Sequence, residues 1–205
     1  MEGKLYTIFP TPVIKYKFPR KFNNIEMNFF DEIKNEINKN YGNYTTKDNY
    51  ILKDDSMKDI FKFCQSCLDS YFEKIYCPSV NTCNLQLTQS WINYTKKDEF
   101  HHAHTHPNSI ISGVFYMNAN KKSDEIIFNK PDSQNQYDIL TKKRNDFNTP
   151  ECSFTIETYD LLLFPSGLYH RVPPVRTDDT RISLAFNSFF RGTIGDAKGL
   201  TELKL

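Results

Sequence analysis

Two hydrophobic patterns divide the chain near residue 80. Before that point apolar residues recur at helical spacing. After it, short β-branched and aromatic segments alternate with turn residues. The first helical pattern places Ile25, Phe29, Ile33 and Ile37 four residues apart and stops at residues 40–42, Asn-Tyr-Gly. We therefore expect an amphipathic helix over this segment.

A second amphipathic helix is expected between Ser56, which can cap its first turn, and the Cys-Pro pair at residues 77–78. The residue before a proline disfavours the helical conformation, so the helix should end there. Its apolar face consists of Ile60, Phe61, Cys64, Leu68, Tyr71, Phe72 and Ile75.

The segment from Cys83 onward predicts an antiparallel barrel or sandwich. About eight strands behind two helices fit a mainly β fold, with a jelly-roll core and flanking helices that support one sheet. We expect one domain over residues 1–205, with helical support at 20–80 and the β core at 83–192. The polar stretch 130–149 is expected to form a long, mobile loop. The expected strands lie near 84–94, 102–106, 110–118, 124–128, 152–157, 160–164, 168–172 and 180–190.

Composition narrows the class of protein. Aromatic residues make up 15% of the chain, which favours β-rich packing, and the net charge of +1 gives no strong signal for nucleic acid or for an anionic membrane. No apolar run is long enough for a signal peptide or a membrane span. The five cysteines follow no disulfide framework, which indicates a reducing cytoplasm. Cys64 and Cys67 have redox spacing but share a helix, and we expect a buried structural pair.

The histidines are the strongest chemical signal. Four of the five lie in residues 101–106, and the fifth is His170. Residues two apart on a strand face the same side, so His104 and His106 can point together into a barrel, and His102 shares their parity nearer the start of the strand. A third ligand from a distant strand would complete a facial triad, the arrangement by which non-haem iron keeps positions open. The alternative is that these histidines are structural.

A second signal follows at Arg181 and Ser183, which share one face of the last expected strand. An inward-pointing arginine is costly unless it has an anionic partner, and its planar fork suits bidentate capture of a carboxylate. The two signals together indicate a metal site beside a dicarboxylate site. The alternative is a surface arginine paired with Asp178 or Asp179.

With these residues in place, the sequence resembles the 2-oxoglutarate- and Fe(II)-dependent oxygenases, a superfamily built on a double-stranded β-helix. It is most similar to a prolyl-hydroxylase-like branch common in bacteria and marine phages, so the gene could be viral and the protein act in the host cytoplasm. Four segments carry this resemblance: Phe9–Val13, which looks like the first strand of that branch, Ser112–Tyr116, Phe164–Ser166 ahead of the distal histidine, and Arg181–Asn187.

The resemblance implies roles for particular residues. Iron(II) would be held by His104, His106 and His170. 2-Oxoglutarate would be bound by Arg181, Ser183 and Tyr116, and also by Tyr94, which stands about ten residues before the first metal histidine. Residues 91–94 could line a substrate mouth, although a lone tryptophan such as Trp91 is more often a core residue.

One departure from the superfamily concerns the ligands. Most members have His-x-Asp, whereas this chain has His104-Thr105-His106. A third neutral imidazole makes the site one unit more positive, which bears on the redox properties of the iron. If His106 is not a ligand, Asp98, Glu99 or Asn108 could supply an oxygen atom.

The resemblance predicts a dioxygenase, a hydroxylase that couples oxidative decarboxylation of 2-oxoglutarate to oxidation of a substrate C–H bond. Its partners would be 2-oxoglutarate, O2 and an unidentified substrate. Two alternatives remain open: a three-histidine cupin-type dioxygenase without 2-oxoglutarate, and a non-catalytic β-barrel binding module. The sequence does not identify the substrate.

Overall fold

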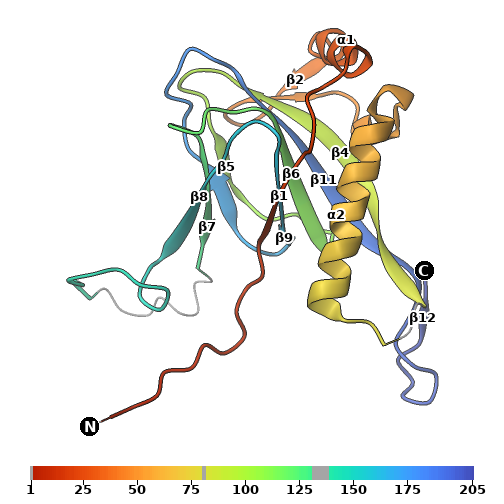
Figure 1. Ribbon diagram of the computed structural model, residues 1–205, viewed down its shortest axis with the longest axis vertical. Coiled ribbons are helices and arrows are strands. Elements are labelled where there is room, and N and C mark those ends of the chain that lie inside the picture. Colours follow the sequence, from red (N-terminus) through yellow and green to blue (C-terminus); the bar gives the residue numbers. More distant parts are fainter. Residues whose placement is uncertain (1, 80–81, 131–138) are drawn as a thin grey trace.

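The computed structural model describes residues 2–79, 82–130 and 139–205 (Figure 1). The fold is mainly β, with antiparallel sheets and two flanking helices, and it is the double-stranded β-helix predicted from the sequence. The helices are α1 (Asn24–Ile33) and α2 (Lys58–Tyr76), and the strands are β1 (Ile14–Lys17), β2 (Ile37–Lys39), β3 (Tyr44–Thr46), β4 (Cys83–Thr95), β5 (His101–His104), β6 (Ile111–Asn118), β7 (Glu125–Asn129), β8 (Glu151–Thr155), β9 (Asp160–Pro165), β10 (His170–Val172), β11 (Arg181–Ile194) and β12 (Leu203–Lys204).

The strands form two sheets. The major sheet has the order β1-β9-β6-β11-β4-β3-β2, with β12 beside β11, and the minor sheet has the order β5-β10-β7-β8. α2 packs against β4 and crosses the outer face of the major sheet (Figure 1). The other face of the major sheet looks toward the minor sheet, and the candidate site lies between the two.

The central strands of the major sheet are apolar on both faces, as expected for strands covered on both sides. In β6, Phe115 joins the core beneath the helices, while Val114 and Tyr116 point between the sheets. In β9, Leu163 likewise packs in the core beneath the helices, and Phe164 points between the sheets. The molecule therefore has two cores, and the period-2 alternation of each strand assigns its side chains to one or the other.

The first helix is shorter than the hydrophobic pattern predicted. It begins with a capping box formed by Asn23 and Glu26 and ends at Ile33. Ile37 lies instead in β2, where it pairs with Thr46 of β3. The predicted helix past Ile33 was wrong because pairing in this hairpin overrides the four-residue spacing.

The second helix was predicted well at its end but not at its start. Cys77 adopts a left-handed conformation directly after α2, as the Cys-Pro pair suggested. At the start, Ser56 is not the cap. The side chain of Asp54 accepts a hydrogen bond from the backbone of Ser56, in a short 3-10 turn that precedes the helix.

All eight expected strands are present, with bounds shifted by a few residues. The N-terminal strand was expected at residues 9–13 but lies at Ile14–Lys17, because these are the residues that pair with β9. Strands β2, β3 and β12 were not expected. Part of the loop predicted at 130–149, residues 131–138, lies outside the described residues.

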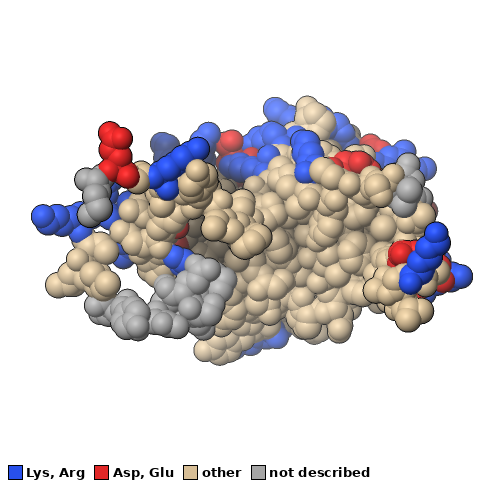
Figure 2. Space-filling model, turned by 90° about the horizontal axis from the view of Figure 1, so that it is seen from below, with Lys and Arg blue, Asp and Glu red and all other residues tan. Residues whose placement is uncertain are grey.

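The surface carries charges of both signs. On the face seen from below, Lys, Arg, Asp and Glu side chains gather mostly toward the margins of a broad uncharged area (Figure 2). Within the part of the chain that the structure describes, no helix is long and apolar enough to cross a membrane.

Gly113 of β6 lies directly beneath the ring of Phe186 in β11. A Cβ atom at this position would overlap that ring, so one of the two strands would have to move. We expect Gly113→Ala to lower the free energy of unfolding by about 2 kcal/mol, as for other overpacked cores. Gly167→Ala is the matched control, because an added Cβ there meets no described atom within 4 Å. Denaturant unfolding of both variants tests this, and equal stabilities would contradict it.

Candidate active site

Three histidines meet between the sheets, and two of them are neighbours in the minor sheet. His104, at the end of β5, pairs directly with His170, at the start of β10. His106 follows β5 by two residues, and its backbone N–H donates to the carbonyl of Ser166 at 2.9 Å, which fixes the loop. Each of the three offers one ligand atom, and these atoms lie within 4.8 Å of one another.

Hydrogen bonds fix which ring nitrogen carries the proton. His104 and His170 each donate from Nδ1 to the backbone carbonyl two residues earlier, at 2.8 and 2.9 Å. His106 donates from Nδ1 to Oδ1 of Asn187 at 2.8 Å. A carbonyl oxygen can only accept, so each Nδ1 carries the hydrogen and each Nε2 keeps its lone pair.

The free lone pairs face one another, because Nε2 of His104 lies 3.0 Å from Nε2 of His106. Burial lowers the pKa of all three histidines. Burial, with added repulsion from His104, lowers the pKa of His106 to about 4 and that of His170 to about 3. The cluster therefore presents three neutral nitrogen donors with no proton between them. This donor set fits a divalent transition metal, which would relieve the contact between lone pairs.

Asn187 was not assigned a role from the sequence, because its direction depends on whether the last strand contains a bulge. In the structure β11 pairs regularly with β6 from Ser183 to Asn187, so Asn187 keeps the face of Arg181 and Ser183 and its side chain points toward His106. Its Oδ1 also accepts from the hydroxyl of Ser112 at 3.0 Å, which holds the amide in this orientation. Asn187 thus orients His106 from behind, in the manner typical of groups behind metal ligands.

The two remaining histidines lie outside the cluster of three. A bulge in the pairing of β10 with β5 brings His101 to the cavity wall, where its ring stacks on His104 at a centroid distance of 4.6 Å. His102 faces away and packs against Tyr41. The parity that His102 shares with His104 in the sequence therefore does not bring it to the cluster.

A narrow cavity of about 20 Å3 extends from the histidines along the inner face of the major sheet. Asn93, Ser183 and Tyr116 form one row across β4, β11 and β6, because Ser183 pairs with both neighbours. The Tyr116 hydroxyl and Oδ1 of Asn93 are buried, and neither has a hydrogen-bond partner among the described residues. Such orphaned polar atoms indicate that the cavity is shaped for a polar ligand.

Arg181 closes the end of this cavity one row further along β11. It is only 4% exposed, so the alternative of a surface arginine paired with Asp178 or Asp179 is wrong. Its Nη1 lies 3.4 Å from Oδ1 of Asp124, and both terminal nitrogens donate to the carbonyl of Pro173. Burial raises the pKa of Tyr116, so the nearby hydroxyl stays protonated and can donate.

Tyr94 is not at this site, contrary to the prediction. Neighbouring residues on a strand face opposite sides, and in β4 the cavity side carries Trp91 and Asn93. Tyr94 points into the core beneath the helices, where burial raises its pKa to about 12. The same alternation corrects Trp91, which lines the cavity and not that core. Asn93, which the sequence reasoning did not select as a site residue, takes the place proposed for Tyr94.

A surface groove adjoins the histidines on the side away from Arg181. It shares Trp91 and His106 with the inner cavity. Its described lining residues carry no Asp, Glu, Lys or Arg, and they include three aromatic rings: Tyr50, Trp91 and Phe189.

Two other expectations concern residues away from the cluster. Glu99, considered as a substitute ligand with Asp98, accepts a hydrogen bond from the backbone of Lys96 at 2.8 Å, and the three-histidine group contains neither residue. Cys64 and Cys67 are buried, free thiols on α2, as expected of a structural pair.

Comparison with protein families gives one match. Residues 89–187 match the family described as "Putative 2OG-Fe(II) oxygenase". A search of curated proteins finds no match. Among solved structures, the chain is similar to an oxidoreductase of the 2OG-Fe(II) oxygenase family from Burkholderia pseudomallei, with 14% identity, a TM-score of 0.55 and coverage of 86% of this chain and 83% of that chain.

Two further structures are similar over most of their length. A prolyl-4-hydroxylase from Pseudomonas putida shares 12% identity, with a TM-score of 0.56 and coverage of 87% of this chain and 94% of that chain. HygX from Streptomyces hygroscopicus, solved with nickel, 2-oxoglutarate and hygromycin B, shares 12% identity, with a TM-score of 0.54 and coverage of 87% and 82%. At such identities these likenesses concern the fold.

Proposed function

Because the chain belongs to the superfamily of 2-oxoglutarate- and iron(II)-dependent oxygenases, we propose that it is a hydroxylase whose iron is held by His104, His106 and His170. The observation that carries this proposal is the convergence of three unprotonated Nε2 atoms. Among the residues that the structure describes, no carboxylate belongs to this cluster of ligand atoms. The ligand set is therefore three neutral imidazoles, with His106 at the position of the usual carboxylate.

We propose further that the distal carboxylate of 2-oxoglutarate binds Arg181, with Ser183 and Tyr116 as additional donors. Arg181 supplies a charged, planar donor, and the unpaired hydroxyl of Tyr116 gains a partner when a carboxylate arrives. Asn93 completes the row and can donate through its amide group. Small Ala185, between this row and Asn187 on β11, leaves room beneath the cosubstrate.

When bound, iron and 2-oxoglutarate supply the oxidising chemistry: O2 converts 2-oxoglutarate to succinate and CO2, and one oxygen atom is transferred to the substrate. The chain's own residues position these groups. Asn187 and two backbone carbonyls hold the imidazoles with Nε2 toward the metal. Val114 and Ile126 help to line the cavity and exclude water from it.

The primary substrate is proposed to bind in the groove beside His106. The described lining of this groove is aromatic and uncharged, which favours an uncharged substrate with an apolar face and hydrogen-bonding groups. We also retain the cytoplasmic location predicted from the cysteines, all five of which are free.

The test is the conversion of 2-oxoglutarate to succinate by purified protein with iron(II) and O2. We expect slow turnover without a primary substrate, and loss of turnover in His106→Ala. Oxidation of a substrate without 2-oxoglutarate would instead support the three-histidine cupin-type dioxygenase. Metal binding with no oxidation of either compound would support a binding module. Full turnover in His106→Ala would show that His106 is not a ligand.

A further inference from the structure

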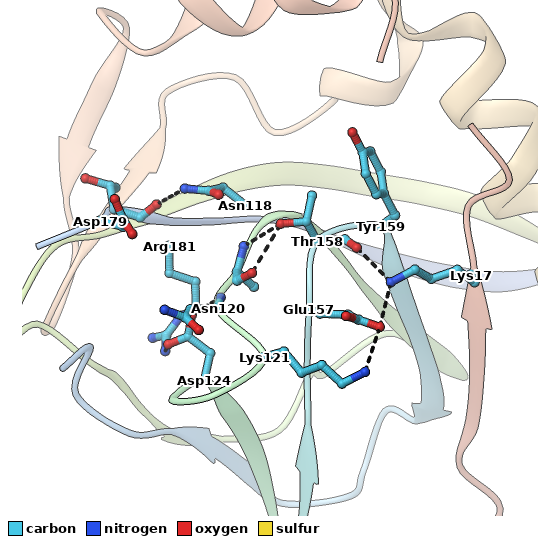
Figure 3. A pocket seen from close by; sticks show the side chains of 12 residues that line it. Lys17, Asn118, Asn120, Lys121, Asp124, Glu157, Thr158, Tyr159, Asp179 and Arg181 are labelled. Atoms are coloured by element: carbon cyan, nitrogen blue, oxygen red, sulfur yellow. Dashed lines mark hydrogen bonds and ion pairs between the residues drawn. The ribbon is translucent and has the colours of Figure 1, made fainter. Parts of the chain in front are cut away.

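Arg181 is shared between the inner cavity and a pocket on the outer surface. The outer pocket has a volume of about 500 Å3 and lies where β6, β9 and β11 meet the loop before β7. Arg181 and Asp124 lie side by side in its wall (Figure 3). The pair therefore separates the proposed cosubstrate cavity from the outside.

The contact between the two side chains is poor for a buried ion pair. A single nitrogen, Nη1, lies 3.4 Å from Oδ1, whereas charge-assisted hydrogen bonds are usually about 2.7–2.9 Å. The second oxygen, Oδ2, accepts from the backbone of Asn120 at 2.8 Å. Both Arg181 and Asp124 are only 4% exposed. Asp124 thus neutralises Arg181 without saturating its five N–H donors.

Asp124 is not required to hold Arg181 in place. The carbonyl of Pro173 accepts from both terminal nitrogens of Arg181, at 3.3 and 3.4 Å. Asp124, in turn, is fixed by Asn120 through its side chain and its backbone. Each partner keeps its position through contacts of its own, so the charge of Asp124 can be removed while the guanidinium stays where it is.

We propose that Asp124 competes with the cosubstrate for Arg181 and so sets a lower affinity for 2-oxoglutarate than the arginine alone would give. This inference rests on the proposed function, in which Arg181 binds the distal carboxylate. Two carboxylates on one guanidinium lie close together, and their repulsion is strong in a buried, weakly polarisable site. Asp124 stabilises the buried arginine when the cavity is empty and opposes the carboxylate that fills it.

The test is calorimetric titration of 2-oxoglutarate into the iron(II) protein without oxygen. We expect Asp124→Asn to bind 2-oxoglutarate about tenfold more tightly than the wild type, which corresponds to about 1.4 kcal/mol. Binding of pyruvate, which has the 2-oxo acid but no distal carboxylate, should not change. Asp179→Asn is the matched control, because Asp179 lines the same pocket and makes no recorded contact with Arg181.

Unchanged or weaker binding of 2-oxoglutarate by Asp124→Asn would overturn the proposal, because Asp124 would then support Arg181 or have no effect on it. An equal gain for pyruvate would also overturn it. If Asp124→Asn does not fold, Asp124→Ser removes the same charge and should show the same tighter binding of 2-oxoglutarate. If Arg181→Gln leaves 2-oxoglutarate binding intact, the assignment of Arg181 in the proposed function has failed. If Arg181→Gln weakens 2-oxoglutarate binding but Asp124→Asn does not tighten it, the assignment of Arg181 stands and only the proposed competition by Asp124 is wrong.

Discussion

Replacing His170 with alanine is expected to weaken iron(II) binding by more than about 100-fold. Changes behind metal ligands typically cost 10–100-fold, and His170 is a proposed ligand itself. His170 is 3% exposed and pairs with His104, and the cluster of ligand atoms contains no fourth described residue that could replace it. Equilibrium dialysis followed by metal analysis measures the effect.

The control for His170→Ala is His102→Ala. His102 lies on β5, two residues from His104, but its ring packs against Tyr41 and away from the cluster. This variant should bind iron(II) as the wild type does. If the two variants bind metal equally well, the three-histidine centre is wrong, provided that both remain folded by thermal unfolding.

Replacing Arg181 with glutamine is expected to weaken 2-oxoglutarate binding by about 100-fold and to leave iron(II) binding unchanged. The loss corresponds to about 2.7 kcal/mol, within the range of hydrogen bonds to charged groups. Pyruvate should bind as before, since it has no distal carboxylate to lose. The measurement is the anaerobic titration described above, with iron(II) binding determined separately.

A structural effect must be separated from this result. Removing Arg181 leaves Asp124 buried without its counterion, and breaking a buried pair costs about 3–5 kcal/mol of stability. The double variant Arg181→Gln/Asp124→Asn removes both charges and should recover most of that loss without recovering 2-oxoglutarate binding. Arg191→Gln, an exposed arginine on the same strand, is the control. Wild-type affinity in Arg181→Gln would exclude Arg181 from the cosubstrate site.

The sequence predicted the strands well because most are short β-branched or aromatic segments with turn residues at their ends. It failed where pairing between distant segments decides the structure. Ile37 continued a helical spacing, yet the hairpin with Thr46 placed it in a strand. Bulges change side-chain direction without any sign in the spacing, which is why the position of His101 at the cavity wall was not found.

Where a predicted site residue follows strand parity, the structure places it beside the others, and its role stays a proposal. His104, His106 and His170 lie together, and Arg181, Ser183 and Tyr116 line one cavity. Tyr94 was placed by its offset from a histidine, and an offset does not fix the side of the strand. Asp124 could not be found, because 57 positions separate it from Arg181 and only the fold brings them together.

The pairing of β4 with β11 also has a consequence for how the protein forms during synthesis. Residues 83–95 pair along their length with residues 181–192, so the middle of the major sheet joins segments separated by most of the β region. Contacts between such distant segments form slowly, because a long loop must close before any hydrogen bond is gained. While the ribosome is still adding the last segment, β11 is missing from its place between β6 and β4. The edges of β4 and β6 that later pair with β11 therefore have no hydrogen-bond partner strand. The nascent chain therefore passes through a stage with unpaired apolar strands, when it is most exposed to aggregation and to chaperones.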